Sequence, residues 1–456
     1  MSDTIVAVST APGRAALGII RLSGEGAVAA AEAVFRPAGG GRLTDRPPHT
    51  LVLGAVVDTE GQMLDEVLCT YARGPRSFTG EDTAELQGHG SPEALSEILR
   101  TLVKQGARPA GPGEFSRRAF LNGRLDLTEA EAIMDIIDSS SPLQLRNAAL
   151  QLRGSVSRRT EEVYSLLLGL LAHFQAVVDY PEEGVEPLEA EELAGQLAET
   201  AARLGRLLRS YERGVLWKEG VKCAILGKPN AGKSSLLNAL LGWERAIVTP
   251  EAGTTRDTLE ETLRLGGLPL RLTDTAGLRE TDSAAEAEGV RRARAAAGEA
   301  RLVLAVFDAS LPLGAEDEDV IAAAREAPAA VALLNKSDLP RRAEKARLEE
   351  AFPLVLDVSA LTGAGLEALE DAIPKLLGGE EPLPLGEILT NERQYAAVCR
   401  AAEAVDRAAE ALRAGFTPDA VLTDTEDALA ALGEVSGRSL REDLIEEVFS
   451  RFCVGK

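Results

Sequence analysis

The spacing of apolar residues changes along the chain and predicts three kinds of region. Short apolar, β-branched runs separated by Gly, Pro and Asp fill residues 3–120, together with one helical spacing at Pro92–Val103. From Leu125 to about Tyr211 the apolar residues follow the 3.6-residue period of a helix, and this period returns after Asn391. Between these two helical parts, apolar runs alternate with helical segments. The pattern predicts an α/β region, a helical region and a second α/β region inserted into the helical one.

The predicted organisation is therefore multidomain, with α/β and all-α parts. We expect an N-terminal α/β domain at 1–120, a discontinuous helical domain at 121–217 and 380–456, and an inserted domain at 218–379. The inserted domain should have a mostly parallel sheet with helices on both faces. Its expected strands are Val221–Leu226, Leu259–Leu265, Leu268–Thr273, Leu302–Phe307, Ala330–Leu334 and Leu354–Val358. Those of the first domain are Thr4–Val8, Gly18–Leu22, Leu51–Val57 and Val67–Ala72.

Local signals refine two parts of this outline. Three glycine-rich stretches, Ala11–Arg14, Ser77–Asp82 and Gln87–Gly90, interrupt the first domain. We interpret them as turns rather than as ligand-lining segments, because glycine is a default turn residue. Thr128–Glu131 has the form of a capping box and predicts the start of a helix.

The inserted domain opens with a phosphate-binding motif. Gly227–Ser234 matches G-x-x-x-x-G-K-S, follows an apolar run and precedes a helical spacing at Ser235–Leu241. Glycines in such a loop let backbone N–H groups approach phosphate oxygens, and the helix N-terminus adds positive potential. We expect Lys233 to contact the terminal phosphates and Ser234 to ligate magnesium.

Three further motifs, each at the end of a predicted strand, indicate GTP rather than ATP. Asp274–Gly277 can hold magnesium through water and sense the γ-phosphate, and Thr255 is a second candidate magnesium ligand. A carboxylate at the end of Asn335–Asp338 can accept two hydrogen bonds from guanine, and Ser359-Ala360 offers a backbone N–H to the guanine carbonyl. The order of these motifs predicts a Ras-like P-loop GTPase domain.

The residue that orients the attacking water is not fixed by these motifs. Leu278 stands where small signalling GTPases carry a glutamine, and leucine cannot hydrogen-bond a water molecule. Four acidic residues in the following segment remain alternatives, namely Glu280, Asp282, Glu286 and Glu288.

Charge, apolar stretches and cysteine spacing argue against several other classes of protein. The net charge of −23 over 456 residues argues against non-specific coating of nucleic acid. No secretory signal precedes the first strand, and the longest uncharged apolar stretch, Val163–Val178, is too short to span a bilayer. The four cysteines, Cys69, Cys223, Cys399 and Cys453, are far apart. They predict neither a disulfide framework nor a zinc site, and they fit a reducing cytoplasm.

Over essentially its full length the chain resembles the tRNA modification GTPases of the MnmE (TrmE) family. The resemblance rests on Gly-Lys-Pro-Asn-Ala-Gly-Lys-Ser-Ser, Ala-Gly-Thr-Thr-Arg-Asp, Asp-Thr-Ala-Gly-Leu-Arg-Glu and the ending Phe-Cys-Val-Gly-Lys. The N-terminal blocks Pro-Gly-Arg, Ser-Phe-Thr-Gly-Glu-Asp and Leu-Gln-Gly-His-Gly match as well. It implies a homodimer formed through N-terminal domains that also bind 5-formyl- or 5,10-methylene-tetrahydrofolate. Arg21, Glu85, Arg124 and Lys456 correspond to the folate-contacting positions, and Arg124 replaces a common lysine.

The resemblance also implies potassium-dependent GTP hydrolysis. It assigns potassium to Asn230, Thr249, Glu251 and Thr254, and it favours Glu286 as the water-positioning glutamate. Lys233 and Cys453 are the other catalytic candidates, although Cys453 equally fits a frayed C-terminal tail. The GTP-binding positions are Asn230, Ala231, Gly232, Lys233, Ser234, Ser235, Thr249, Pro250, Glu251, Ala252, Gly253, Thr254, Thr255, Asp274, Thr275, Ala276, Gly277, Asn335, Lys336, Asp338, Ser359 and Ala360.

With an FAD-dependent partner, MnmG (GidA), in a heterotetramer, the family forms 5-carboxymethylaminomethyl or aminomethyl uridine at the wobble position of tRNA. The one-carbon unit comes from folate, and no membrane is involved. A regulatory GTPase in ribosome assembly is the alternative function, because the GTPase motifs alone fit it equally well.

Overall fold

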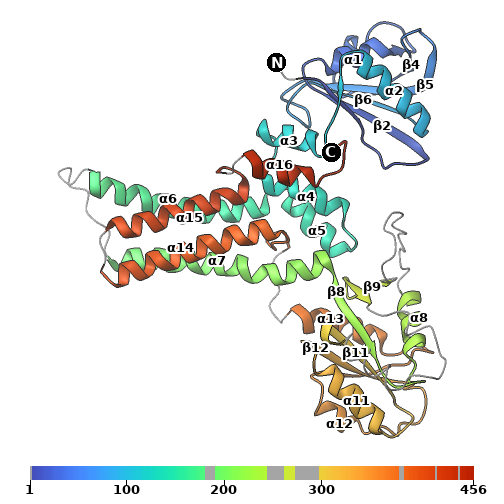
Figure 1. The fold of residues 1–456 in the computed structure, drawn as a ribbon, viewed down its shortest axis with the longest axis vertical. Coiled ribbons are helices and arrows are strands. Elements are labelled where there is room, and N and C mark those ends of the chain that lie inside the picture. Colours follow the sequence, from blue (N-terminus) through green and yellow to red (C-terminus); the bar gives the residue numbers. More distant parts are fainter. Residues whose placement is uncertain are drawn as a thin grey trace. The chain divides into compact units, whose positions relative to one another are not determined.

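The structure, a computed structural model, describes residues 3–179, 190–243, 261–272, 297–378, 385–415, 418–439 and 442–456. The chain divides into two compact units, and Figure 1 labels many of their helices and strands. The first unit comprises Met1–Met134, Gln151–Leu197 and Glu403–Lys456, and the second comprises Asp135–Leu150 and Ala198–Ala402. This division passes through two long helices, so the domain boundaries given above stay a prediction.

The sheet of the first unit is almost entirely antiparallel. In the part of the chain that the structure describes, its strands are β1 Ile5–Val8, β2 Ala15–Ser23, β3 Phe35–Pro37, β4 Val52–Val57, β5 Met63–Ala72, β6 Thr83–Gly90 and β7 Arg108–Pro109. They lie in the order β3-β4-β5-β6-β2-β1-β7, and of these neighbours only β1 and β7 are parallel. Each strand predicted for this region is confirmed, with ends that shift by up to four residues.

One face of this sheet carries the core of the first unit. Helices α1 (Ala27–Val34) and α2 (Pro92–Lys104) pack against it, and η1 (Leu43–Asp45) adds a short turn. Alternate residues of a strand point to opposite faces, so Ile20 and Leu22 of β2 are both buried beneath these helices. On strands β4 and β5, Leu53 and Leu68 are paired in register and are exposed.

The interpretation of Gln87–Gly90 as a turn was wrong, because these residues form the end of β6. Their glycines permit close packing inside the sheet instead. A Cβ at Gly88 would lie 2.8 Å from a methyl carbon of Val67, and one at Gly90 would lie 2.5 Å from the carbonyl oxygen of Ala15. His89 between them is exposed, and its Nδ1 lies 2.7 Å from Oδ1 of Asp65.

Helices make up the rest of the first unit and part of the second, and all of those given next except α3 lie where the 3.6-residue spacing predicted helices. They are α3 Glu114–Leu121, α4 Leu127–Ile137, α5 Pro142–Gln151, α6 Ser155–Asp179, α7 Ala190–Glu219, α14 Glu392–Arg413, α15 Pro418–Ser436 and α16 Glu442–Ser450. Within the first unit α6 lies against α15, and α16 lies against α3 (Figure 1). Phe449 of α16 takes part in the second of these contacts, with its ring centroid 6.1 Å from that of Phe120 of α3.

The capping box of α4 lies two residues before the predicted one. Asp126 Oδ1 accepts the N–H of Glu129, and Glu129 Oε2 accepts the N–H of Asp126, both at 2.9 Å. Thr128 is already inside the helix, where its hydroxyl donates to Asp126 Oδ1. Aspartate is as good an N-cap as threonine, and here it also precedes the first helical residue.

The second unit contains a six-stranded sheet with one antiparallel edge. Among the described residues its strands are β8 Val221–Leu226, β9 Glu261–Leu265, β10 Leu268–Leu272, β11 Leu302–Asp308, β12 Ala329–Asn335 and β13 Val355–Asp357. The order is β13-β12-β11-β8-β10-β9, and of these neighbours only β9 and β10 run antiparallel. The prediction of a mostly parallel sheet is confirmed.

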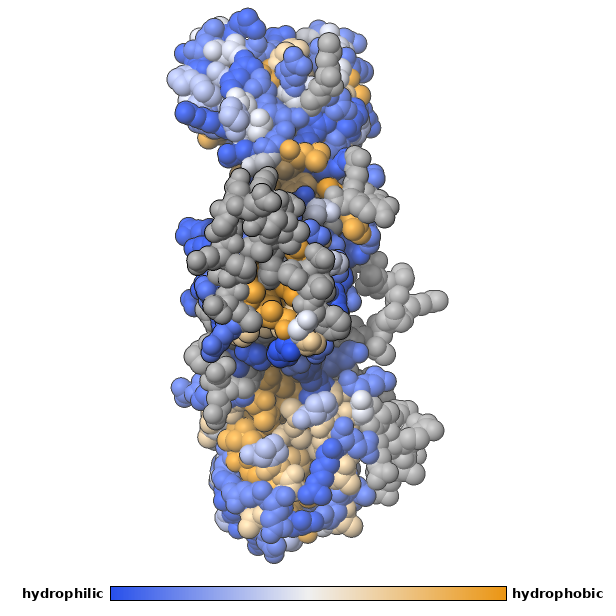
Figure 2. Space-filling view, turned by 90° about the vertical axis from the view of Figure 1, so that its left-hand side faces the viewer, coloured by the Kyte–Doolittle hydropathy of each residue, from blue (hydrophilic) through white to orange (hydrophobic). Residues whose placement is uncertain are grey.

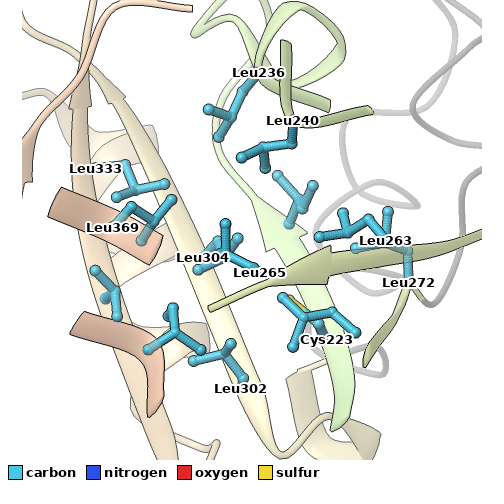
Figure 3. Packing of buried hydrophobic residues seen from close by; sticks show 14 of the residues in the cluster. Cys223, Leu236, Leu240, Leu263, Leu265, Leu272, Leu302, Leu304, Leu333 and Leu369 are labelled. Atoms are coloured by element: carbon cyan, nitrogen blue, oxygen red, sulfur yellow. The ribbon is translucent and has the colours of Figure 1, made fainter. Parts of the chain in front are cut away.

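Helices cover both faces of this sheet, as expected for parallel strands. Helices α8 (Lys233–Trp243) and α13 (Leu366–Gly378) share one cluster with Leu302 and Leu304 of β11, part of which Figure 3 shows. Helices α11 (Ala315–Ala324) and α12 (Lys345–Glu349) share the other cluster with residues such as Phe307. The sheet is therefore buried on both sides, and its loops at the carboxyl ends of the strands remain available for a ligand.

Hydrophilic residues cover most of the surface at the top of Figure 2, where the sheet of the first unit lies. None of the helices described here combines the length and the apolar character needed to cross a membrane.

Candidate functional sites

The loop between β8 and α8 is shaped by glycines that lie against neighbouring strands. Gly232 has a φ of +97°, and a Cβ there would lie 2.2 Å from Nδ2 of Asn335. At Gly227 a Cβ would lie 2.5 Å from the carbonyl oxygen of Val306. Helix α8 then begins at Lys233, and the first N–H groups of a helix have no partner within it. This geometry fits a group that accepts backbone hydrogen bonds, as phosphate does.

The ammonium group of Lys233 lies over the same loop. Its Nζ donates to the carbonyl oxygens of Gly227 at 2.7 Å and of Lys228 at 3.0 Å. Burial lowers the pKa of Lys233. The predicted phosphate-contacting lysine is therefore positioned by the backbone of its own motif.

Asn335 joins the phosphate loop to the predicted guanine site. Its Nδ2 donates to the carbonyl oxygen of Ala231 at 2.9 Å, and its Oδ1 accepts the N–H of Ala360 at 3.0 Å. The hydroxyl of Ser359 donates to Oδ1 of Asp338 at 2.6 Å. Residues from three separate motifs thus meet at the carboxyl ends of β8, β12 and β13. The N–H of Ala360 is thus taken by Asn335, and the N–H of Ser359 donates to the carbonyl oxygen of Ala364 at 2.9 Å. The prediction that Ser359-Ala360 offers a backbone N–H to the guanine carbonyl is therefore wrong in this structure, whereas the Asp338 carboxylate lies at the same edge of the sheet.

Lys336 adds a second link between these motifs. It has a φ of +61°, and its Nζ donates to the carbonyl oxygen of Asn230 at 2.9 Å and to Oδ2 of Asp308 at 2.6 Å. Burial raises the pKa of Asp308, but hydrogen bonds from Lys336 and Ser310 outweigh it and hold the pKa below its usual value. Asp308 was not predicted from the sequence, although an aspartate that ends an apolar strand run is a signal that could have indicated it.

A buried ion pair anchors the phosphate loop from the other side. Nζ of Lys228 lies 2.7 Å from Oδ2 of Asp317, whose side chain is only 1% exposed. Oδ2 also accepts the N–H of Gly314 at 2.9 Å, while Oδ1 has no hydrogen-bond partner among the described residues. This pair was not predicted from the sequence either. Its members lie 89 positions apart, and neither belongs to a motif position that requires it.

A second candidate site lies on the first unit, where a pocket of about 580 Å³ opens between β5, β6 and the segment after α3. Residues that line it include Tyr71, Arg76, Ser77, Phe78, Glu85 and Arg124. Arg21 pairs with Glu85 across neighbouring strands, with Nε 2.8 Å from Oε1, and its guanidinium lies 5.4 Å from the centre of the Phe78 ring. Three of the four predicted folate-contacting residues, Arg21, Glu85 and Arg124, are therefore at or next to this pocket.

Comparison with known proteins identifies the family. A sequence model described as "GTP-binding protein TrmE N-terminus" matches residues 4–124, and one described as "MnmE helical domain" matches residues 127–453. The protein named tRNA modification GTPase MnmE from Roseiflexus sp. strain RS-1 is 44% identical over 100% of this chain and 99% of its own length. The protein of the same name from Thermus thermophilus is 45% identical, with complete coverage of both chains. The chain belongs to the MnmE family.

A solved structure that resembles part of this MnmE family member is that of Era in complex with MgGDPNP and nucleotides of 16S ribosomal RNA. It is 29% identical, covers 40% of this chain and 66% of its own, and has a TM-score of 0.26.

The C-terminal segment of this MnmE family member is held by its main chain. The carbonyl oxygen of Lys456 accepts the N–H of Phe115 at 3.1 Å, and that of Cys453 accepts the N–H of Gly113 at 3.2 Å. Gly455 has a φ of +93°, and its carbonyl oxygen accepts the hydroxyl of Ser9. The alternative of a frayed tail is therefore wrong. Cys453 itself is exposed, and neither it nor Lys456 is among the described residues that line the pocket.

Part of the predicted GTP site lies outside the described residues. This applies to Thr249, Pro250, Glu251, Ala252, Gly253, Thr254, Thr255, Asp274, Thr275, Ala276, Gly277 and Glu286. It also applies to the alternatives Glu280, Asp282 and Glu288. Ser234 and Ser235 are described, and both lie in the first turn of α8.

Proposed function

We propose that this chain binds and hydrolyses GTP and acts in tRNA modification, as the names of its full-length relatives state of those proteins. The observation that carries the GTP part is the double hydrogen bond of Asn335 to Ala231 and Ala360, which joins the phosphate loop to the guanine site. The Asp338 carboxylate then selects guanine, because it can accept two N–H groups that adenine does not present together.

Exchange of a single atom at Asp338 tests this selection. In Asp338→Asn the side chain presents an N–H donor to guanine, so GTP affinity should fall while affinity for xanthosine triphosphate rises. Asp319→Asn, an exposed change on α11, is the matched control and should alter neither. If Asp338→Asn kept the affinity for GTP, another residue would have to recognise the base.

We also propose that potassium and magnesium support hydrolysis. Ser234 and Thr255 would hold magnesium, and Asn230, Thr249, Glu251 and Thr254 would hold potassium, which supplies positive charge against the developing negative charge. Asn230 has a φ of +60°, and its carbonyl oxygen is bonded to Lys336, so the backbone beside its side-chain amide is held in one conformation. Faster hydrolysis in potassium than in sodium, abolished in Asn230→Ala, is the expected result. Equal rates in the two salts for the unsubstituted protein would remove potassium from the proposal.

Glu286 is the proposed water-positioning residue. Glu286→Ala should bind GTP normally and lose most hydrolysis, and Glu280→Ala in the same acidic segment is the control. If Glu280→Ala lost hydrolysis instead, the assignment would pass to that residue.

The pocket of the first unit is proposed to bind a reduced folate. Its volume of about 580 Å³ suits a ligand of this size, and the exposed ring of Phe78 offers apolar surface to a pterin. Glu85 can accept the N–H groups of a pterin, while Arg76 and Arg124 can pair with carboxylates at the other end. Calorimetric titration with 5-formyltetrahydrofolate tests this directly, and Glu85→Gln should weaken binding because it replaces an acceptor oxygen with a donor.

The one-carbon unit of folate would then reach the wobble uridine of tRNA with an FAD-dependent MnmG partner, and Cys453 is the candidate thiol. The exposed pair Leu53 and Leu68 on the open face of the first sheet supports a homodimer through this unit. Wobble uridine should lack its 5-aminomethyl-type modification in cells without the protein. Unchanged tRNA together with co-purification of ribosomal particles would favour a role in ribosome assembly.

A further inference from the structure

A buried arginine of α3 lies at the centre of an ion cluster in the first unit. The side chain of Arg118 is 10% exposed and meets the carboxylates of Asp3, Glu81 and Glu114. The distances are 2.6 Å from Nη2 to Asp3 Oδ1, 3.0 Å from Nη1 to Glu81 Oε2 and 3.0 Å from Nη2 to Glu114 Oε1. Because a buried guanidinium needs such acceptors for its N–H groups, the cluster holds Arg118 in one orientation.

One of these carboxylates belongs to the loop at Ser77–Asp82, which joins β5 to β6. Oε2 of Glu81 also accepts the hydroxyl of Ser23 at 2.8 Å, and that hydroxyl oxygen lies 2.6 Å from Oγ1 of Thr79. Ser23 and Thr79 are both fully buried. A continuous chain of polar contacts therefore leads from Arg118 through Glu81 into the middle of the loop.

The residues that follow α3 hold the same loop at two more points. Nδ2 of Asn122 donates to the carbonyl oxygen of Thr79 at 2.7 Å, and Nε of Arg124 donates to that of Ser77 at 3.2 Å. Gly80 has a φ of +79°, and a Cβ there would lie 2.9 Å from Cβ of Asn122. The loop thus rests closely on the end of α3, and Ser77 and Arg124 both line the pocket.

We propose that Arg118 is a positioning residue for this pocket. It holds Glu81, and through Glu81 it sets where the loop presents Ser77 and Phe78 to a ligand. Arg118 does not itself line the pocket. As a proposal about folate affinity, this rests on the function proposed above. As a proposal about the loop, it rests on the contacts alone.

Arg108 provides a matched comparison within the same cluster. It pairs with Asp3 and Glu114, two of the three carboxylates that Arg118 meets. Its side chain is 48% exposed, and its hydrogen bonds within the described residues go to Asp3, Glu114 and the carbonyl oxygen of Pro109, none of which belongs to the loop. Loss of Arg108 should therefore disturb the ion cluster without releasing the loop.

The experiment compares Arg118→Met, Arg118→Lys, Glu81→Gln and Arg108→Met in the full-length chain. Three quantities are measured: the Kd of 5-formyltetrahydrofolate by calorimetry, amide hydrogen exchange at residues 77–82, and the rate of GTP hydrolysis. Arg118→Met should weaken folate binding by at least about tenfold, as expected when a charge-assisted hydrogen bond that organises a site is lost. It should also speed exchange in the loop. Arg118→Lys should restore part of the folate affinity and part of the slow amide exchange in the loop. Arg108→Met should change folate affinity by less than about twofold.

Hydrolysis of GTP should be unchanged in all four variants, because the phosphate loop lies in the second unit. Amide exchange in β2 and β6 as slow as in the unsubstituted protein shows that the first unit of a variant is folded. If Arg118→Met fails this check, Glu81→Gln replaces it, since it removes the charge from the same contact and keeps the shape of the side chain. Equal effects of Arg118→Met and Arg108→Met on the loop, or no effect of either, would overturn the proposal. If the unsubstituted protein does not bind folate, the proposed ligand is wrong, and the exchange data still decide whether Arg118 positions the loop.

Discussion

The buried ion pair between Lys228 and Asp317 should contribute strongly to the stability of the second unit. In Lys228→Met the methionine keeps most of the length of the lysine but cannot pair with the carboxylate. The Asp317 side chain is 1% exposed, so water cannot replace the lost ammonium group. The N–H of Gly314 remains as its hydrogen-bond donor. Removal of one member of a buried ion pair generally costs about 3–5 kcal/mol of folding free energy.

We expect Lys228→Met to lower the free energy of unfolding by about 3–5 kcal/mol at pH 7, because the Asp317 carboxylate then stays buried without the Lys228 ammonium group.

Urea denaturation followed by tryptophan fluorescence measures this loss. The chain has two tryptophans, Trp217 at the end of α7 and Trp243 at the end of α8, and Trp217 packs against the core of the second unit. Lys222→Met, at an exposed lysine of β8, is the control and should change stability by less than about 0.5 kcal/mol.

The double variant Lys228→Met Asp317→Leu should recover most of the lost stability, because it removes the uncompensated charge. A loss of under about 1 kcal/mol at pH 7 would show that this pair contributes no more than an exposed one.

Three further predictions concern the first unit. Burial raises the pKa of Glu114, but hydrogen bonds led by that from Arg108 outweigh it and hold the pKa at about 2. The stabilisation from Glu114 is therefore complete above about pH 4.5 and is lost as the pH falls towards 2. In that window the midpoint temperature of thermal unfolding should depend less on pH for Glu114→Gln than for the unsubstituted protein. Gly90→Ala should lower the free energy of unfolding, measured by urea denaturation, by about 1–3 kcal/mol, because its Cβ would meet the carbonyl oxygen of Ala15. An unchanged urea midpoint would contradict the close packing at this position. Asp126→Ala should cost about 0.5–2 kcal/mol by the same assay through loss of the N-cap of α4, whereas Thr128→Ala should cost less.

The sequence predicted four strands of the first sheet, the strands of the second sheet and the long helices, because their signals are local, but it did not predict α1, α3, β3 and β7. Alternating or continuous apolar runs indicated the strands, and the 3.6-residue period indicated the long helices. Two errors arose where the same type of residue occurs in more than one kind of local structure. Glycines at Gln87–Gly90 were interpreted as a turn, but they lie inside β6 because neighbouring atoms leave no room for a side chain. The capping box was assigned to Thr128 although Asp126 two residues earlier has the same chemistry.

Those residues of the candidate sites that belong to contiguous sequence motifs could be predicted. The structure brings Ala231, Asn335 and Ala360 together, as the motifs suggested. Asp308 and Asp317 were missed because each acts on a residue that is distant in sequence, and no spacing rule connects an aspartate of one element to a lysine of another. Only the folded sheet, which brings the ends of β8, β11 and β12 side by side, reveals these partners.

Both candidate sites depend on the same physical arrangement. A glycine-containing loop provides the contacts to a ligand, and glycine gives that loop many conformations of similar energy. A side chain from a neighbouring helix then selects one of them: Asp317 of α11 holds the phosphate loop through Lys228, and Arg118 of α3 holds the pocket loop through Glu81. Each helix is fixed by its own packing, so the selecting side chain loses little freedom when the loop is ordered. Ligand affinity in this protein should therefore depend on residues that never touch a ligand, and most strongly on those whose partner is a loop residue.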